Sequence, residues 1–282
     1  EDAGLFPFDS DGDGLDDNCG WQSLSAGTTQ SCVLDSSGSI VCWGGGINSL
    51  VQDIPTGTFT ALSAGGQQDC VLDAAGLLQC WGSDNYGQVS EVPAGSFAAV
   101  STGDRHICAL DTAGTVTCWG RDDDGQSSSA PTGSFSAVSG GYAHNCVLDA
   151  AGSIACWGSD SAGQVSNVPS GTFTAMSAGY FHNCALDSAG LITCWGQGSF
   201  GQSTPPSGTF SALSCGTNHS CAIDTSGFVV CWGADSDSQV SNAPAVTFTT
   251  LSAGGNHNCA LSTSGAILCW GSDDDGEVSG TP

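Results

Sequence analysis

Five histidines recur at a nearly constant interval, and histidine is the side chain best suited to metal binding and to proton transfer near neutral pH. Successive members are 37 or 38 residues apart, so each would belong to a separate structural unit. Gln30 and Gln68 occupy the same position in two further units, and an amide does not exchange a proton in this pH range. The pattern favours a hydrogen-bonding structural role for His106, His144, His182, His219 and His257.

Alternating aspartates in the first 20 residues form a candidate calcium site. Calcium takes about six to eight oxygen ligands, and aspartates at every second position around a glycine turn can converge on one ion. Gly20 stands where an EF-hand loop has its bidentate glutamate. The segment resembles instead a thrombospondin type 3 repeat, which implies calcium binding. The predicted ligands are the carboxylates of Asp9, Asp11, Asp13 and Asp17 and the backbone carbonyl of Leu15.

Two further sets of acidic residues repeat along the chain. One set starts short predicted turns, three residues before a glycine, where an aspartate hydrogen-bonds to its own backbone: Asp35, Asp73, Asp111, Asp149, Asp187 and Asp224. The other set follows the Trp-Gly pairs and includes Asp84, Asp122, Asp123, Asp124, Asp160, Asp235, Asp237, Asp273, Asp274 and Asp275. Equivalent loops of a repeat protein emerge on one side, so the second set predicts an acidic patch. A solvated face, weak calcium binding and docking of a basic partner all remain open for it.

The composition excludes several classes of function. The chain has 282 residues, 28 acidic against two basic side chains, and a net charge of −26. Nucleic-acid binding depends on lysine and arginine contacts to phosphates, so no nucleic-acid partner is expected. No apolar run of about 18 residues predicts a membrane span. The acidic first residues contain no apolar signal core, so we expect a chain from which any signal peptide has been removed.

Cysteine spacing indicates the compartment. Fourteen of the 16 cysteines form seven pairs, each separated by ten residues. A zinc site would need closely spaced Cys or His ligands such as CxxC, and the sequence has none. The pairing predicts disulfides and therefore secretion into an oxidising environment. The pairs are Cys32–Cys42, Cys70–Cys80, Cys108–Cys118, Cys146–Cys156, Cys184–Cys194, Cys221–Cys231 and Cys259–Cys269.

The elements that carry these residues form a tandem array. Cys-Trp-Gly occurs seven times at steps of 38 or 37 residues, and an aromatic residue opens every unit. The predicted repeats are 21–58, 59–96, 97–134, 135–172, 173–209, 210–247 and 248–282, after an acidic leader of residues 1–20. Repeats of this length with several short strands are typical of β-propellers. The sequence predicts an all-β, seven-bladed propeller with three to four short antiparallel strands per blade.

One unit shows how the strands and the disulfide fit together. Residues 173–177, 183–186 and 191–195 alternate or concentrate apolar residues as strands do, and the tail 196–209 reads as a long turn. A three-residue hairpin loop with glycine in the left-handed position places Asp187 opposite Leu191. Cys184 then faces Cys194 at a non-hydrogen-bonded site, where Cα atoms approach most closely. Each bridge is therefore predicted to staple the middle hairpin of its blade.

The unit resembles the repeat of the regulator of chromosome condensation family, in its bacterial secreted form. The pattern is carried by Ala178-Gly179, His182, Ala185-Leu186, Gly190, Trp195-Gly196 and Gly201-Gln202, and it recurs seven times from residue 21 to the end. The resemblance implies a seven-bladed propeller with a surface for protein partners, since members include a GTPase exchange factor and bacterial inhibitors of β-lactamases. It also implies a location at the bacterial cell surface or outside the cell. The paired cysteines depart from the family's common pattern, and the acidic charge argues against chromatin binding.

Two cysteines and an apolar tip stand outside the repeat pattern. Cys19 lies in the leader, and Cys215 replaces a small residue of the sixth unit, so we expect the two to pair with each other. The bond could lie within one chain, or between chains in a head-to-tail contact that builds filaments. We expect the apolar leader residues Leu5, Phe6 and Phe8 to pack against an apolar surface of the same propeller or of its neighbour.

The sequence therefore predicts a non-enzymatic, secreted interaction protein. No nucleophile elbow, phosphate loop or dinucleotide fingerprint occurs in the chain. The leading hypothesis is a calcium-stabilised building block of an extracellular or cell-surface assembly, whose partner is another copy of itself joined through the leader. The alternative is a soluble propeller that binds or inhibits another extracellular protein through one face.

A non-reducing gel of the protein from its native source distinguishes the two positions of the Cys19 bond. If Cys19 and Cys215 join different molecules, a ladder should collapse on reduction to a band near 28.0 kDa. A single monomer band in both lanes would place the bond inside one chain and would contradict a covalent polymer.

Overall fold

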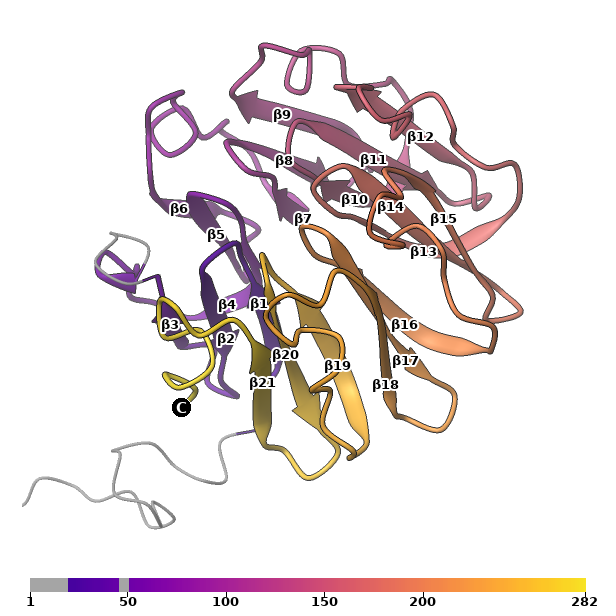
Figure 1. Ribbon diagram of the computed structural model, residues 1–282. Helices are drawn as coiled ribbons and strands as arrows, with labels where there is room; N and C mark the ends of the chain where they lie inside the picture. Colours follow the sequence, from indigo (N-terminus) through magenta and orange to yellow (C-terminus); the bar gives the residue numbers. More distant parts are fainter. Residues whose placement is uncertain (1–19, 46–50) are drawn as a thin grey trace, which may run out of the picture.

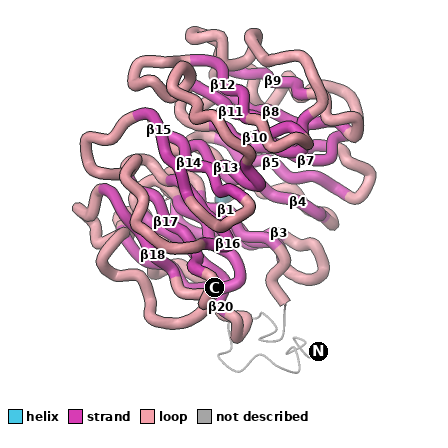
Figure 2. The backbone as a smooth tube through the Cα atoms, turned by 90° about the vertical axis from the view of Figure 1, so that its right-hand side faces the viewer, coloured by secondary structure: helices cyan, strands magenta, loops and turns pink. Residues whose placement is uncertain are grey.

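Seven three-stranded antiparallel sheets form the blades of a propeller in the computed structural model, which describes residues 20–45 and 51–282. Each sheet holds three strands in chain order. The last blade lies beside the first, and the C-terminus lies near β3 (Figure 1). The orthogonal view in Figure 2 shows the strands in the interior and the loops at the periphery. The all-β, seven-bladed architecture is confirmed, with three strands in each blade.

The first strand of each blade lines the central channel. These strands are β1 (Ser23–Ala26), β4 (Phe59–Ala64), β7 (Phe97–Thr102), β10 (Phe135–Gly140), β13 (Phe173–Ala178), β16 (Phe210–Cys215) and β19 (Phe248–Ala253). The middle strands are β2 (Gln30–Leu34), β5 (Gln68–Asp73), β8 (His106–Asp111), β11 (His144–Asp149), β14 (His182–Asp187), β17 (His219–Asp224) and β20 (His257–Ser262). The outer strands are β3 (Ile40–Gly44), β6 (Leu78–Gly82), β9 (Val116–Gly120), β12 (Ile154–Gly158), β15 (Ile192–Gly196), β18 (Val229–Gly233) and β21 (Ile267–Gly271).

The hairpin between β14 and β15 forms as its turn residues predict. Asp187 Oδ1 accepts hydrogen bonds from the backbone N–H groups of Ala189 and Leu191 at 2.8 and 2.9 Å, and Gly190 adopts a φ of 80° that favours glycine. This turn sets the register in which Cys184 pairs with Cys194, with a Cα–Cα distance of 4.0 Å. Each of the other six predicted pairs is likewise a disulfide between the second and third strands.

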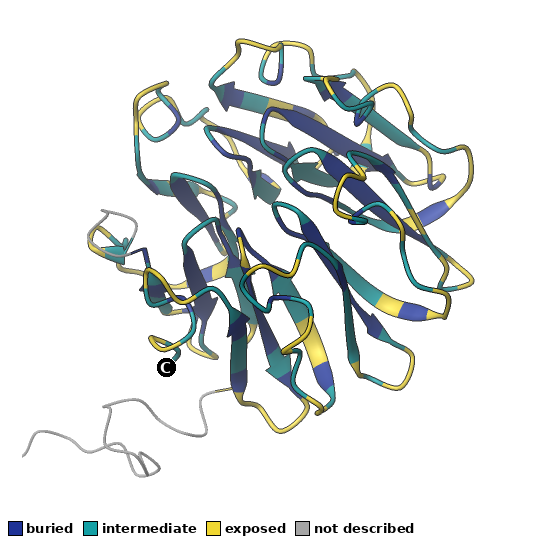
Figure 3. Cartoon of the chain, in the orientation of Figure 1, coloured by how far each residue is buried: buried dark blue, intermediate teal, exposed yellow. Residues whose placement is uncertain are grey.

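The core is divided into clusters between neighbouring blades. Middle strands are buried along nearly their whole length because a blade covers each face, while exposed residues gather in the turns and loops (Figure 3). In one cluster, Cys146 and Leu148 of the fourth blade pack against Phe173, Ala185 and Trp195 of the fifth. Because the core is distributed in this way, no blade can bury its apolar surface alone.

The ring closes without an open edge facing the channel. The serine of each first strand accepts a hydrogen bond from a backbone N–H of the next first strand, at 2.9 to 3.0 Å. The acceptors are Ser25, Ser63, Ser101, Ser139, Ser177, Ser214 and Ser252, and the last of these accepts from Ala26 of the first blade. The indole N–H of Trp43 also donates to the backbone carbonyl of Glu277 at 2.8 Å, which ties the end of the chain to the first blade.

Buried polar side chains clamp each blade to the next. His106 Nε2 lies 2.7 Å from Asn145 Oδ1, and the Asn145 amide donates to the Gln126 carbonyl at 2.9 Å. Trp157 donates to the same carbonyl at 2.9 Å. The amide contact fixes Oδ1 as an acceptor, so the imidazole donates from Nε2. The remaining histidine contacts, at 2.8 Å, are His144–Asn183, His182–Ser220, His219–Asn258 and His257–Ser31.

This clamp gives the repeated histidines a structural role, as the sequence predicts. Burial lowers the pKa of His182 to about 3 and the pKa of the other four to about 4. A neutral imidazole is therefore required in the folded protein, while the unfolded chain takes up protons below about pH 6.5. The five histidines stabilise the fold above that pH, and their contribution is lost as the pH falls toward 4.

Asp69 is an exception in the clamp because it occupies the position that Asn145, Asn183 and Asn258 fill in other blades. It is fully buried, and its Oδ1 accepts from Gln30 at 2.9 Å and from the Gly65 N–H at 3.1 Å. Its Oδ2 has no hydrogen-bond partner in the described part of the chain. Burial raises the pKa of Asp69 to about 7, so the folded protein holds a proton that the unfolded chain releases.

The Asp69→Asn variant should be more stable than the wild type at pH 8, by on the order of 2 kcal/mol. The wild-type carboxyl contributes stability below about pH 4, and this contribution is lost as the pH rises to about 7. The difference between the two proteins should therefore vanish near pH 4. Denaturant unfolding at pH 4, 6 and 8 with the disulfides intact measures it.

Asn145→Asp provides the matched reversal, since it places a carboxyl in the corresponding position of the fourth blade. It should lower the free energy of unfolding at pH 8 and leave it nearly unchanged at pH 4. Equal stability of wild type and Asp69→Asn at pH 8 would show that Asp69 is not a buried uncompensated charge.

Candidate functional site

The antiparallel strands place two sets of loops at one face of the ring. The first set joins first and second strands and comprises residues 27–29, 65–67, 103–105, 141–143, 179–181, 216–218 and 254–256. The second set follows the outer strands, and the two sets are tied together by backbone hydrogen bonds such as Arg121 N to Arg105 O at 2.9 Å. We call this side the mouth face. The aspartate turns between second and third strands lie on the opposite side, the turn face.

The acidic loops lie on the mouth face, but their first aspartates have a local structural task. Asp160 Oδ1 accepts hydrogen bonds from the backbone N–H groups of Val165 and Ser166 at 2.8 and 2.9 Å. The same pattern holds for Asp84, Asp122, Asp235 and Asp273. These contacts lower the pKa of Asp160. The sequence does not distinguish these aspartates, whose carboxylates bond the loop backbone, from the neighbouring aspartates of the same loops.

A cavity of about 190 Å³ opens at the channel mouth. Its wall consists mainly of the serine, alanine and glycine residues that end the first strands. At Gly103 a Cβ atom would lie 2.6 Å from the carbonyl oxygen of Gly141 and would overlap the His106 ring, so these positions admit no side chain. The next position carries larger side chains in several blades. We call it the mouth ring, and all of its members except Tyr142 line the cavity: Thr28, Gly66, Asp104, Tyr142, Tyr180, Thr217 and Gly255.

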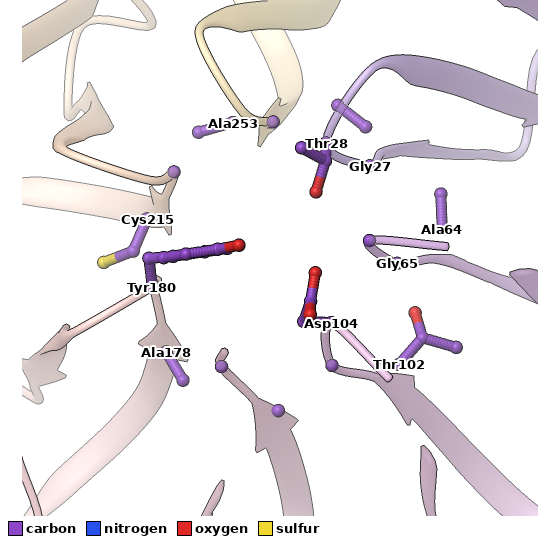
Figure 4. A pocket seen from close by; sticks show the side chains of 18 of the residues that line it. Gly27, Thr28, Ala64, Gly65, Thr102, Asp104, Ala178, Tyr180, Cys215 and Ala253 are labelled. Atoms are coloured by element: carbon purple, nitrogen blue, oxygen red, sulfur yellow. The ribbon is translucent and has the colours of Figure 1, made fainter. Parts of the chain in front are cut away.

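Asp104 is the only charged member of the mouth ring, and its side chain points into the cavity together with those of Tyr180 and Thr28 (Figure 4). The residue is 8% exposed. Its Oδ2 lies 3.3 Å from Arg105 Nε, although neither atom has a hydrogen-bond partner in the described chain. Burial raises the pKa of Asp104, against the opposing effects of Arg105, Arg121 and a hydrogen bond with Tyr180.

The chain's aromatic hydroxyls and its cations gather around this carboxylate. All three tyrosines and both arginines of the protein lie in blades two to five on the mouth face. The rings of Tyr142 and Tyr180 are 4.3 Å apart, and Phe181 lies 5.3 Å from both. The guanidinium groups of Arg105 and Arg121 lie 6.0 and 5.8 Å from the rings of Tyr86 and Tyr142, within cation–π range. We call Tyr86, Asp104, Arg105, Arg121, Tyr142, Tyr180 and Phe181 the mouth cluster.

Cys215 lies in the channel wall, where it is buried and forms no disulfide with another described residue. Its sulfur is within 4.8 Å of ligand atoms of His182 and Cys184. Cys184 is bonded to Cys194, so its sulfur is not available as a thiolate, and this group does not form a metal site of the usual kind. Burial raises the pKa of the Cys215 thiol to about 11.

Residues 1–19 of the leader lie outside the described residues. This applies to the predicted calcium ligands Asp9, Asp11, Asp13, Leu15 and Asp17, to Leu5, Phe6 and Phe8, and to Cys19 as the predicted partner of Cys215. These assignments stay predictions of the sequence. In the described ranges 20–45 and 51–282, no helix is long and apolar enough to cross a membrane.

Comparison with known proteins agrees with the repeat architecture. The solved ectodomain of the receptor kinase CR4 from Physcomitrella patens is 28% identical, with a TM-score of 0.76, over 88% of this chain and 72% of that one. The CRINKLY WD40 ectodomain of the Arabidopsis thaliana receptor kinase ACR4 is 25% identical, with a TM-score of 0.76, over 93% and 98% of the two chains.

Yeast RCC1 (Prp20), solved bound to Kap60, is 17% identical with a TM-score of 0.70, over 91% of this chain and 84% of that one, and shares the fold. No curated protein sequence matches the chain. The model of the regulator of chromosome condensation (RCC1) repeat matches residues 97–126, 135–164, 173–202, 210–239 and 248–277, which together make up more than half of the sequence. The chain therefore belongs to the family of RCC1-repeat proteins.

Proposed function

We propose that this propeller is an extracellular protein-binding domain that holds its partner on the mouth face. The observation that carries the proposal is the mouth cluster. All three tyrosines and both arginines of the chain lie on the mouth face, around the channel mouth. Tyrosine and arginine are enriched among the residues that dominate binding energy at protein interfaces.

An extracellular location is supported by two independent features. Seven disulfides within the blades are suited to an oxidising compartment. The two similar receptor-kinase structures are ectodomains. A bacterial cell surface, as the form of the repeat implies, remains part of the proposal.

Binding fits the mouth better than catalysis does. The five histidines, which are the usual proton-transfer groups, are buried in contacts between blades and do not line the cavity. The channel wall consists of small residues whose serine hydroxyls already accept backbone hydrogen bonds. This arrangement offers a rigid frame with a cluster of adaptable side chains at one end, which is how binding domains on repeat scaffolds are built.

The leader adds a second proposal, which concerns assembly. Calcium bound by residues 9–17 would order the leader, and a bond from Cys19 to Cys215 would fasten it to its own propeller or to the next copy. Cys215 is buried in the channel wall, among the residues that line the cavity at the mouth. A leader that reached this cysteine would therefore lie next to the proposed binding face, so assembly and partner binding would compete.

A capture experiment with paired variants tests the mouth face. Tyr86→Ala/Arg121→Ala removes two members of the mouth cluster, whereas Leu77→Ala/Leu191→Ala removes two exposed side chains of the turn face, which are 52% and 50% exposed. The immobilised proteins are incubated with surface and secreted proteins of the producing cells, and bound proteins are quantified by mass spectrometry. At least one protein should be recovered about tenfold less by the mouth-face variant.

The turn-face variant should recover that protein at the wild-type level. If every protein retained by the wild type is lost with the turn-face variant instead, or with neither variant, the mouth face is not the binding surface. Thermal unfolding of both variants checks that the ring stays folded.

A further inference from the structure

We propose that the channel mouth receives the ammonium or guanidinium group of a lysine or arginine side chain of the protein partner, with Asp104 as its counter-ion. This inference rests on the proposed function, because it names the chemistry by which a partner on the mouth face would be recognised. The insertion would place one cationic head group in the cavity of about 190 Å³.

The first support is the incomplete pairing of Asp104. More than nine-tenths of the residue is buried, and its Oδ2 has no hydrogen-bond partner in the described chain. Burying a carboxylate without sufficient partners is costly. Arg105 gives partial compensation at 3.3 Å, but its guanidinium lies over the Tyr86 ring and the side chain is 35% exposed. A second cation in the cavity that Asp104 lines would add the electrostatic compensation that Arg105 supplies only in part.

The second support is the oxygen-rich opening. The Tyr180 and Thr28 hydroxyls point toward the same space as the Asp104 carboxylate (Figure 4). The Tyr180 hydroxyl interacts with that carboxylate. A lysine or arginine head group offers several donors to such acceptors, while its aliphatic stem can pack along the neighbouring Tyr142 and Phe181 rings.

Charge favours a cation over an anion at this position. The chain carries a net charge of −26, which attracts basic proteins and repels acidic ones. The two arginines could in principle hold an anion, but Arg105 faces Asp104 and Arg121 is bound to Asp123 at 2.7 Å. A calcium ion would need about six to eight oxygen ligands, whereas the mouth ring contains one carboxylate. These features favour an organic cation.

Titration with a short peptide tests the inference even while the protein partner is unidentified. The probe is acetyl-Gly-Gly-Lys-Gly-Gly-amide at low ionic strength, and its binding is followed by amide chemical shifts of the nitrogen-15-labelled protein. Saturable shifts should concentrate at residues 103–105, 141–143 and 179–181. Asp104→Asn should weaken binding about tenfold or more, and a peptide with norleucine in place of lysine should not bind.

Asp274→Asn is the matched control because it removes the same charge from an exposed loop of the same face. It should change the affinity less than about twofold. Shifts spread over the acidic loops, or equal losses with Asp274→Asn and Asp104→Asn, would overturn the inference in favour of general attraction to a polyanion. Tyr180→Phe, which keeps the ring and removes the hydroxyl, should weaken binding and provides a second variant should Asp104→Asn alter the fold.

The two proposals can fail separately. If the partner captured through the mouth face binds Asp104→Asn as well as it binds wild type, the face is correct and the inserted cation is wrong. If the peptide binds in an Asp104-dependent way while no protein depends on the mouth cluster, the cation site stands and the protein-binding role of the face does not.

Discussion

The contact between neighbouring first strands determines how closely the blades approach one another and how narrow the central channel is. Each first strand has a sheet partner on one side only, so its other edge would expose unpaired N–H groups to the channel. Around the whole ring, a serine hydroxyl of each first strand accepts a hydrogen bond from one of these N–H groups in the next blade. The close approach they require leaves room only for small residues at the wall, as at Gly103. A narrow channel with a well-defined mouth follows from this packing.

Repetition explains stability, and departures from it point to function. The disulfides occur in all seven blades, the aspartate turns in six and the histidine clamps in five, and none of these features sets blades two to five apart from the rest as a group. The mouth cluster does so, because Asp104, Arg105, Tyr142 and Tyr180 occupy positions that other blades fill with unrelated side chains. Asp69 is also a departure, but it lies inside the clamp and away from the surface. Within residues 20–45 and 51–282, the departures at the mouth bring tyrosine and arginine side chains together at one face.

Local features were predictable from the sequence because they depend on short spacings. The glycine turn predicted the hairpin register, the ten-residue interval between cysteines matched that register and predicted the seven disulfides, and the repeat length indicated a propeller. The mouth cluster could not be found in this way. Tyr86 follows an outer strand while Tyr180 follows a first strand, so their shared face depends on strand direction and ring geometry and not on sequence interval. The clamp was predicted only as a hydrogen-bonding role, because its partners lie in the next blade, 38 or 39 residues away along the chain, or 226 residues away where the last blade meets the first. The calcium leader and the Cys19 bond depend on residues 1–19, and the sequence remains their sole support.

Hydrogen–deuterium exchange of the protein, alone and with its captured partner, tests whether the mouth face is the binding surface. Protection on binding is expected only at the mouth face, at residues 103–105, 121–124, 141–143 and 179–181, while the aspartate turns exchange as in the free protein. Protection centred on the turns at residues 73–77 and 187–191, with the mouth unchanged, would contradict it.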